Sequence, residues 1–167
     1  MRRKDRAVTS QDEIRAILEE SDSFRLALND KAAGVPYIVP LNYGYVYDGE
    51  RLTLYFHSAA AGRKLDLIAE NPIAGFELDC AHRLITGEAA CSCSMEYQSI
   101  IGTGTVAELV TPEEKATGLN ILMQKYSGSA AHEFPAQMLD RTAVFRLDAS
   151  AFSAKKHIVE KKQENRL

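Results

Sequence analysis

One stretch of the sequence combines the residue types that bind a phosphate group. Residues 54–64 read Leu-Tyr-Phe-His-Ser-Ala-Ala-Ala-Gly-Arg-Lys, which predicts a strand that runs through small residues into a helix. Backbone N–H groups at a helix start bind anions, and the Ser58 hydroxyl and Lys64 ammonium would add two donors. Cations in a first turn oppose the helix dipole, so Arg63 and Lys64 fit an occupied anion site. The alternative is a pair of solvated surface charges.

Two more polar side chains stand out on predicted strands. Asn42 follows Pro40 and Leu41 within an otherwise apolar stretch, where an amide is unfavourable unless it has hydrogen-bond partners. It is either a structural amide at a bulge or a hydrogen-bond partner of a heteroaromatic ring. His57 is a single strand histidine, which is more often structural than catalytic. Its ordinary pKa near neutrality would nevertheless suit proton transfer.

Other chemistries find little support in the sequence. Neither a G-x-G-x-x-G nor a Walker A pattern is present, so the Rossmann and P-loop classes are not indicated. The cysteines are Cys80, Cys91 and Cys93, an odd number that argues against a disulfide framework. The C-x-C at 91–93 has no second pair for zinc, so we predict no metal site.

Composition and charge exclude several classes of protein. The chain has 167 residues, 46% hydrophobic and 26% charged, as in an ordinary globular domain. Residues 1–6 carry a charge of +3, and residues 153–167 also carry +3. Since the net charge of the chain is −3, the body between these ends carries −9. An acidic body argues against nucleic-acid binding. No apolar run approaches the roughly 18 residues of a membrane span, and no secretory signal pattern is visible. We therefore expect a cytoplasmic protein.

Periodicity predicts the elements that must position these residues. Helices are expected over 11–20, after a capping box at 10–13, over 62–70, from Thr111-Pro112 onward and, briefly, over 135–139. Strands are expected over 24–29, 35–47 and 51–58, as a meander with a hairpin at Asp48-Gly49, and over 73–79, 97–110 and 142–148. The strand over 97–110 is expected to bend at Gly102 or Gly104. Since the helices do not alternate with every strand, the fold class is mainly β, an antiparallel barrel with peripheral α-helices.

Several blocks in collinear order over residues 1–150 resemble the 5-nitroimidazole-resistance family. That family belongs to the FMN-binding superfamily of pyridoxamine 5′-phosphate oxidase. The blocks are Arg-Arg-Lys-Asp-Arg at 2–6, Arg-Leu-Ala-Leu at 25–28, Pro-Tyr-Ile-Val-Pro-Leu-Asn-Tyr-Gly-Tyr at 36–45, Leu-Tyr-Phe-His-Ser at 54–58, Gly-Arg-Lys at 62–64, Tyr-Gln-Ser-Ile-Ile-Gly-Thr-Gly at 97–104 and Glu-Glu-Lys at 113–115.

The resemblance implies a six-stranded antiparallel split barrel of the FMN-binding type. It implies a single domain over 1–152, a polar tail over 153–167, and a homodimer with flavin at its interface. The cofactor would be FMN, with FAD as the alternative. The implied cofactor-binding residues are Val39, Pro40, Leu41, Asn42, Phe56, His57, Ser58, Gly62, Arg63, Lys64, Tyr97 and Ser99, with Tyr97 and Ser99 coming from either subunit.

The implied activity is an NAD(P)H-dependent reduction of nitroaromatic or similar small acceptors. His57 is the candidate catalytic proton donor. The chain departs from the expected family pattern at residues 31–34, which lengthen a hairpin turn, and at 91–94. The residues that vitamin B6 oxidation needs for its substrate phosphate are not visible, so that activity is not expected. The alternatives are a non-catalytic flavin-binding or flavin-sensing protein, and a split barrel that binds haem or a deazaflavin.

Overall fold

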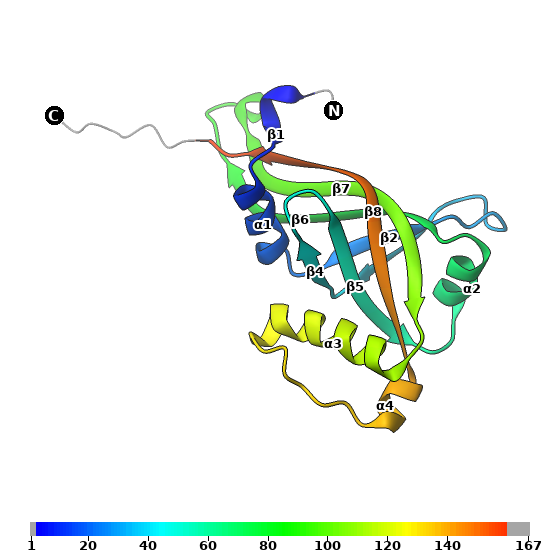
Figure 1. The fold of residues 1–167 in the computed structure, drawn as a ribbon. Helices are drawn as coiled ribbons and strands as arrows, with labels where there is room; N and C mark the ends of the chain where they lie inside the picture. The colour runs from blue at the N-terminus through cyan, green and yellow to red at the C-terminus, as the bar shows by residue number, and fades with distance from the viewer. Residues whose placement is uncertain (1–2, 160–167) are drawn as a thin grey trace.

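The strands form one antiparallel sheet that curls into an open barrel (Figure 1). The structure is a computed structural model that describes residues 3–159. The strands are β1 (Ala7–Val8), β2 (Phe24–Leu28), β3 (Tyr37–Leu41), β4 (Gly44–Tyr47), β5 (Leu52–Ala59), β6 (Ile73–Ile85), β7 (Ser94–Leu109) and β8 (Thr142–His157). Their order is β3-β2-β6-β7-β8-β5-β4, and β1 pairs with β8.

Short helices lie around the sheet, and local sequence signals explain where they begin. They are η1 (Lys4–Arg6), α1 (Gln11–Glu20), α2 (Arg63–Glu70), η2 (Ala90–Ser92), α3 (Pro112–Ser127) and α4 (Ala136–Asp140). The Ser10 side chain accepts the Glu13 N–H at the start of α1, and Thr111 and Glu114 form a capping box at the start of α3. The predicted fold class, mainly β with peripheral helices, is confirmed.

The curl of the sheet follows from its connectivity. β3 and β4 lie at opposite ends of the strand order, yet only Asn42 and Tyr43 separate them in the chain. Two residues span no more than about 7 Å, so the sheet must bend round until these ends meet. Tyr43 is fully buried at this junction, and its hydroxyl donates to the Leu18 carbonyl oxygen at 2.7 Å.

The predicted meander is wrong at its middle strand, whereas the predicted hairpin at Asp48-Gly49 is confirmed by the pairing of β4 with β5. The apolar stretch over 35–47 is two strands: β3 pairs with β2, whereas β4 pairs with β5. This division, together with the short β1, turns the expected six strands into eight among the described residues. The bend predicted in the long strand is confirmed, since the β7–β8 register shifts between Thr103 and Gly104.

Two strands are longer than expected. β6 continues to Ile85, into residues that gave no readable pattern, and β8 continues to His157. Residues 153–157, which the sequence assigned to a polar tail, therefore pair within the sheet. The rest of that tail, from residue 160, lies outside the described residues.

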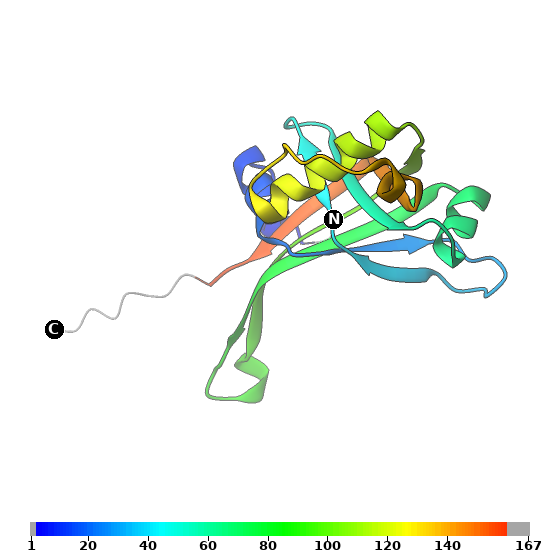
Figure 2. The same cartoon turned by 90° about the horizontal axis from the view of Figure 1, so that it is seen from below.

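Alternate residues of the strands fill the core, and α3 closes it on one side. Phe24, Leu54 and Phe56 are fully buried, and the Phe56 ring stacks on Phe145 at 5.3 Å. α3 crosses β4 so closely that a Cβ on Gly44 would lie 2.5 Å from the Ile121 backbone. Figure 2 shows α3 against one side of the sheet, and the β6–β7 hairpin projecting away from the other.

The outer face of β3, β2, β6, β7 and β8 carries small and apolar side chains in one row, beside a row that includes the Arg25–Glu77 ion pair at 3.5 Å. The strand register aligns one row across it, Ile38, Ala27, Gly75, Thr103 and Ala151. Ile38 is 61% exposed and Ile101, in the neighbouring row, is 51% exposed. Exposed apolar surface of this kind is typical of an interface.

Candidate functional site

A small hollow lies where β5 turns into α2, at the motif singled out by the sequence. Its volume is about 180 Å³. The residues around it come from β3, β5 and α2, three elements that the curl of the sheet brings together. They are Tyr37, Ser58, Ala59, Ala61, Gly62, Arg63, Lys64 and Leu65.

The start of α2 faces this hollow without a side-chain cap. Gly62 is the N-cap residue, with φ +127° and ψ 168°, and no side chain accepts a hydrogen bond from the first turn. Only glycine adopts this backbone conformation readily. The first N–H groups of a helix lack intrahelical partners and carry the positive end of the dipole. The hollow therefore offers uncapped donors to an anion.

The Arg63 side chain is fixed by contacts with Asp30 and Tyr37. Its Nε donates to Asp30 Oδ2 at 2.8 Å, a second guanidinium nitrogen donates to the same oxygen, and its Cζ lies 5.2 Å from the Tyr37 ring centre. The Asp30 side chain is 3% exposed and also accepts the Ala33 N–H at 2.9 Å. These donors, the Ala33 N–H first and Arg63 second, lower the pKa of Asp30. Asp30 thus balances much of the Arg63 charge.

Lys64 is placed differently from its neighbour. It is half-buried beside the hollow, and it forms no ion pair with any described residue. Burial lowers the pKa of its ammonium group, because desolvation disfavours the charged form. An anion in the hollow would compensate this cost. Lys64 is therefore the side chain best placed to hold a phosphate.

His57 and Ser58 precede the hollow on β5. Partial desolvation first, and the Lys64 charge second, lower the pKa of His57, although much of its surface is exposed. The imidazole is therefore mainly neutral at pH 7. The Ser58 hydroxyl donates to the Ala59 carbonyl oxygen at 2.9 Å, so its oxygen is free to accept rather than to donate.

The predicted ring-contacting segment presents less side chain than the sequence suggested. Val39 and Leu41 pack against the core and Phe56 is fully buried, whereas Pro40 is exposed. The Val39 and Leu41 side chains are therefore only partly open to a ligand, and the Phe56 side chain is closed to it. Asn42 is not inside a strand, as predicted, but exposed in the break between β3 and β4.

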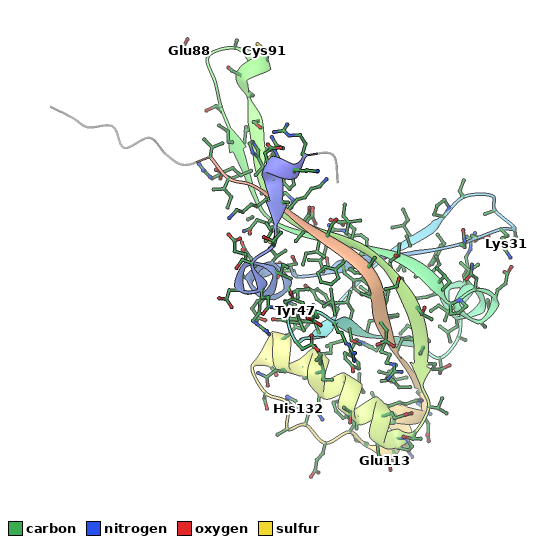
Figure 3. The ribbon with its side chains drawn as sticks, turned by 45° about the horizontal axis from the view of Figure 1, so that its top comes forward. Lys31, Tyr47, Glu88, Cys91, Glu113 and His132 are labelled. Atoms are coloured by element: carbon green, nitrogen blue, oxygen red, sulfur yellow. The ribbon has the colours of Figure 1, made fainter. Side chains whose placement is uncertain are left out.

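Tyr97 and Ser99 lie far from α2 within one chain. Tyr97 is eight residues along β7 from Thr105, the partner of Ile73 at the α2 end of β6. At 3.3 Å per residue this is about 26 Å. In Figure 3, Lys31, at the tip beside α2, lies well apart from Cys91, at the β6–β7 tip. One chain does not bring all the predicted site residues together.

The partners of Arg63 were not found from the sequence. Asp30 stands in a turn-rich segment, and Asp favours turns through its own backbone contacts. Nothing local indicates its contact with a residue 33 positions away. Tyr37 is part of the β3 pattern and carries no separate signal.

Other polar groupings are engaged within the fold or exposed. A hollow of about 240 Å³ between α1 and α3 contains Lys125, whose ammonium donates to the Leu18 and Glu19 carbonyl oxygens. Cys80 is buried, and Cys91 and Cys93 are exposed and free.

Within residues 3–159, no group of three or more His, Cys, Asp or Glu side chains is arranged to hold a metal ion. None of the helices formed by these residues is long and apolar enough to cross a membrane.

The family defined as pyridoxamine 5′-phosphate oxidase matches residues 10–156, most of the chain. The chain belongs to the pyridoxamine 5′-phosphate oxidase family. This confirms the superfamily indicated by the sequence blocks. The matched range contains β2 to β7 whole and nearly all of β8, so every residue of the α2 hollow lies within the family's shared domain.

Solved structures of other proteins share the fold of this chain. A candidate 5-nitroimidazole antibiotic resistance protein from Bacteroides thetaiotaomicron is 26% identical, with a TM-score of 0.77 over 90% of this chain and 86% of that one. An FAD and heme binding protein from Mycobacterium smegmatis is 19% identical, with a TM-score of 0.79 over 92% and 74%. A flavocytochrome from Azotobacter vinelandii is 19% identical, with a TM-score of 0.75 over 95% and 72%. A search of curated proteins found no match.

Proposed function

We propose that this protein binds FMN, with the cofactor phosphate at the start of α2. The observation that carries the proposal is Lys64, a half-buried ammonium without an ion-pair partner among the described residues, beside an uncapped helix start. A phosphate would accept from the first N–H groups and from Lys64 together. Family membership supports a flavin, and FAD is the alternative that cofactor analysis separates.

A second copy of the chain would complete the site. The α2 hollow, at about 180 Å³, is smaller than the roughly 300–1,000 Å³ of typical cofactor pockets. It accommodates the phosphate end, and the flavin ring must then lie outside it. Because Tyr97 and Ser99 stand at the far end of β7, they would reach that ring from the partner subunit. The exposed small and apolar face of β2, β3, β6 and β7 is the surface we assign to this homodimer.

We assign the protein to the flavin-dependent reductases of nitroaromatic or similar small acceptors, with NADH or NADPH as donor. A bound flavin supplies the hydride and electron transfer. The chain's own part is to bind and orient the cofactor and to exclude water. His57, next to the phosphate site on the exposed side of β5, would donate the proton that the reduced acceptor requires.

The experiment that tests the phosphate site is FMN titration of wild-type protein and Lys64→Ala. Loss of a charge-assisted hydrogen bond, at roughly 1.5–3 kcal/mol, predicts a tenfold to hundredfold weaker Kd in the variant. Lys31→Ala is the matched control: Lys31 lies beside α2 and pairs with the exposed Glu70 at 3.8 Å, so its Kd should stay within a factor of two of wild type. Equal affinity of all three proteins would contradict the assignment.

The reductase assignment needs a separate measurement. Flavin-loaded protein is mixed with NADH or NADPH without oxygen, and a nitroaromatic acceptor is then added. Bleaching by the donor and return of colour with the acceptor are expected. A flavin that binds but does not cycle would favour the non-catalytic, flavin-sensing alternative.

A further inference from the structure

The two basic ends of the described chain meet at one corner of the fold. β1 pairs with β8, with Ala7 opposite Lys155 and Val8 opposite Ala154. η1 therefore lies beside the end of β8, on the opposite side of the molecule from α2 (Figure 1). The basic residues near both ends of the sequence are therefore close together in the fold. They lie away from the proposed phosphate site at α2.

A hollow of about 220 Å³ opens in this corner. Its lining is mostly basic: Arg3, Asp5, Arg6, Lys156, His157 and Ile158. A space of this size accommodates one or two phosphate groups rather than a whole nucleotide.

Arg6 is the distinctive residue of the corner. Its Nε is buried and has no hydrogen-bond partner among the described residues. Its other donor contact is a long one, 3.5 Å from Nη1 to the Tyr97 hydroxyl. Buried donors are normally satisfied, and an unsatisfied one calls for an explanation such as an absent ion. Because Nε itself has no accessible surface, an anion in the hollow would accept from the two Nη groups, whose one hydrogen bond within residues 3–159 is the long one to Tyr97.

The carboxylates around the corner are already paired. Asp5 pairs with Arg3 at 2.5 Å, Glu13 of α1 pairs with Lys156, and Glu96 of β7 pairs with Arg83 at 2.5 Å and accepts the Val159 N–H. The cations that line the hollow are Arg3, Arg6 and Lys156, three against the Asp5 and Glu13 carboxylates that pair with two of them, an excess of +1. Arg6 has no carboxylate partner within residues 3–159.

We propose that this corner, centred on Arg6, binds the diphosphate of a dinucleotide. The guanidinium fork matches phosphate geometry, and the local charge excess attracts an anion to an otherwise acidic protein. The identity of the ligand rests on the proposed function. Arg6 contacts Tyr97, which would face the partner's flavin, so a phosphate bound here belongs to a molecule that lies along the flavin cleft. That molecule is the nicotinamide dinucleotide donor, NADH or NADPH, because the diphosphate of FAD includes the flavin phosphate that we assign to the start of α2.

The test is a calorimetric titration with ADP under two conditions that remove the α2 site from competition. One uses wild-type protein saturated with FMN, and the other uses Lys64→Ala without flavin. We expect ADP to bind in both, and Arg6→Gln to weaken its Kd by roughly tenfold or more. Arg141→Gln, the same change at an exposed arginine beside α4, should leave the Kd unaltered. Binding that survives Arg6→Gln, or no binding at millimolar ADP, would overturn the site.

The two conditions separate this proposal from the proposed function. If FMN does not bind but ADP still binds Lys64→Ala through Arg6, the anion site stands and the flavin assignment fails. Thermal unfolding checks that Arg6→Gln folds. If it does not fold, Arg6→Lys replaces it: loss of the fork with retention of the charge should weaken ADP binding to a smaller extent, and an unaltered Kd would count against the site.

Two further comparisons test the electron donor as the source of the diphosphate. Arg6→Gln should raise the KM for NADH or NADPH in FMN-loaded protein and spare kcat. The same variant should leave the Kd for FMN and for FAD unaltered, because the flavin phosphate lies at α2. A variant whose KM for NADH and NADPH equals that of wild type would overturn the proposal.

Discussion

At the scale of single residues, the α2 site depends on how two adjacent cations are used. Asp30 and Tyr37 fix Arg63 in the wall of the hollow, whereas Lys64 keeps a desolvated ammonium beside it. Arg63 therefore shapes the site and Lys64 is left to bind. This division assigns the larger direct effect on phosphate affinity to Lys64.

His57 offers a prediction in pH. Its pKa lies below the ordinary 6.5, so the protonated, donating form accumulates only as the pH falls below that value. If His57 donates the proton, kcat should rise as the pH is lowered from 7.5 through 6.5, provided chemistry limits turnover. His57→Gln should lower kcat, remove this rise, and leave the Kd for FMN unchanged. Turnover with the same magnitude and pH profile in both proteins would exclude His57 from the reaction.

The sequence could indicate which residues surround the proposed phosphate site, but it could not show the different contacts of Arg63 and Lys64. Residues 54–64 carried a local signal, a strand entering a helix with donors at the junction, and the structure places Ser58, Gly62, Arg63 and Lys64 around one hollow. The Asp30 contact crosses 33 positions of sequence, so only the folded chain shows that Arg63 is engaged.

At the scale of elements, local signals were reliable and long-range pairing was not. The capping residues Ser10 and Thr111 predicted where α1 and α3 begin. The apolar stretch over 35–47 gave no sign that β3 and β4 belong to opposite edges, because both halves alternate like one strand. Its division depends on β8 occupying the other side of β5, which no local pattern encodes.

The contact between α3 and β4 yields a stability prediction. Gly44→Ala would place a Cβ about 2.5 Å from backbone atoms of Ile121 and Leu122, closer than atoms can approach. Overpacking of this kind costs about 1–3 kcal/mol in the free energy of unfolding, measurable by urea denaturation. Val46→Ala, an exposed change on the same strand, is the control and should cost less than about 1 kcal/mol. A Gly44→Ala protein as stable as this control would show that α3 does not lie on β4.

At the scale of the whole molecule, one chain does not bring the proposed site together. The α2 hollow and Tyr97 stand at opposite ends of the long strands, and between them runs an exposed face with a row of small and apolar residues. Pairing of two copies through this face would cover the exposed Ile38 and Ile101 and bring the two ends together across subunits.

The homodimer can be tested with one added charge. Thr103 lies in the row of small and apolar residues, between Gly75 and Ala151, and is exposed in the single chain, so Thr103→Arg should fold. It should elute and sediment as a monomer and bind FMN more weakly, because half of each site is lost. Thr117→Arg, on the exposed side of α3, is the matched control and should remain dimeric with unchanged FMN affinity. A dimeric Thr103→Arg protein would show that the interface lies elsewhere.

The measurement that tests the central claim most directly is the absorbance spectrum of the purified protein, after reconstitution with FMN and removal of excess, with the released cofactor identified by mass spectrometry. A flavoprotein with this site should show bands near ~370 and ~450 nm, at one FMN per subunit. A spectrum of haem or of a deazaflavin would redirect the cofactor assignment within the same fold. A protein that stays colourless after reconstitution would contradict the account.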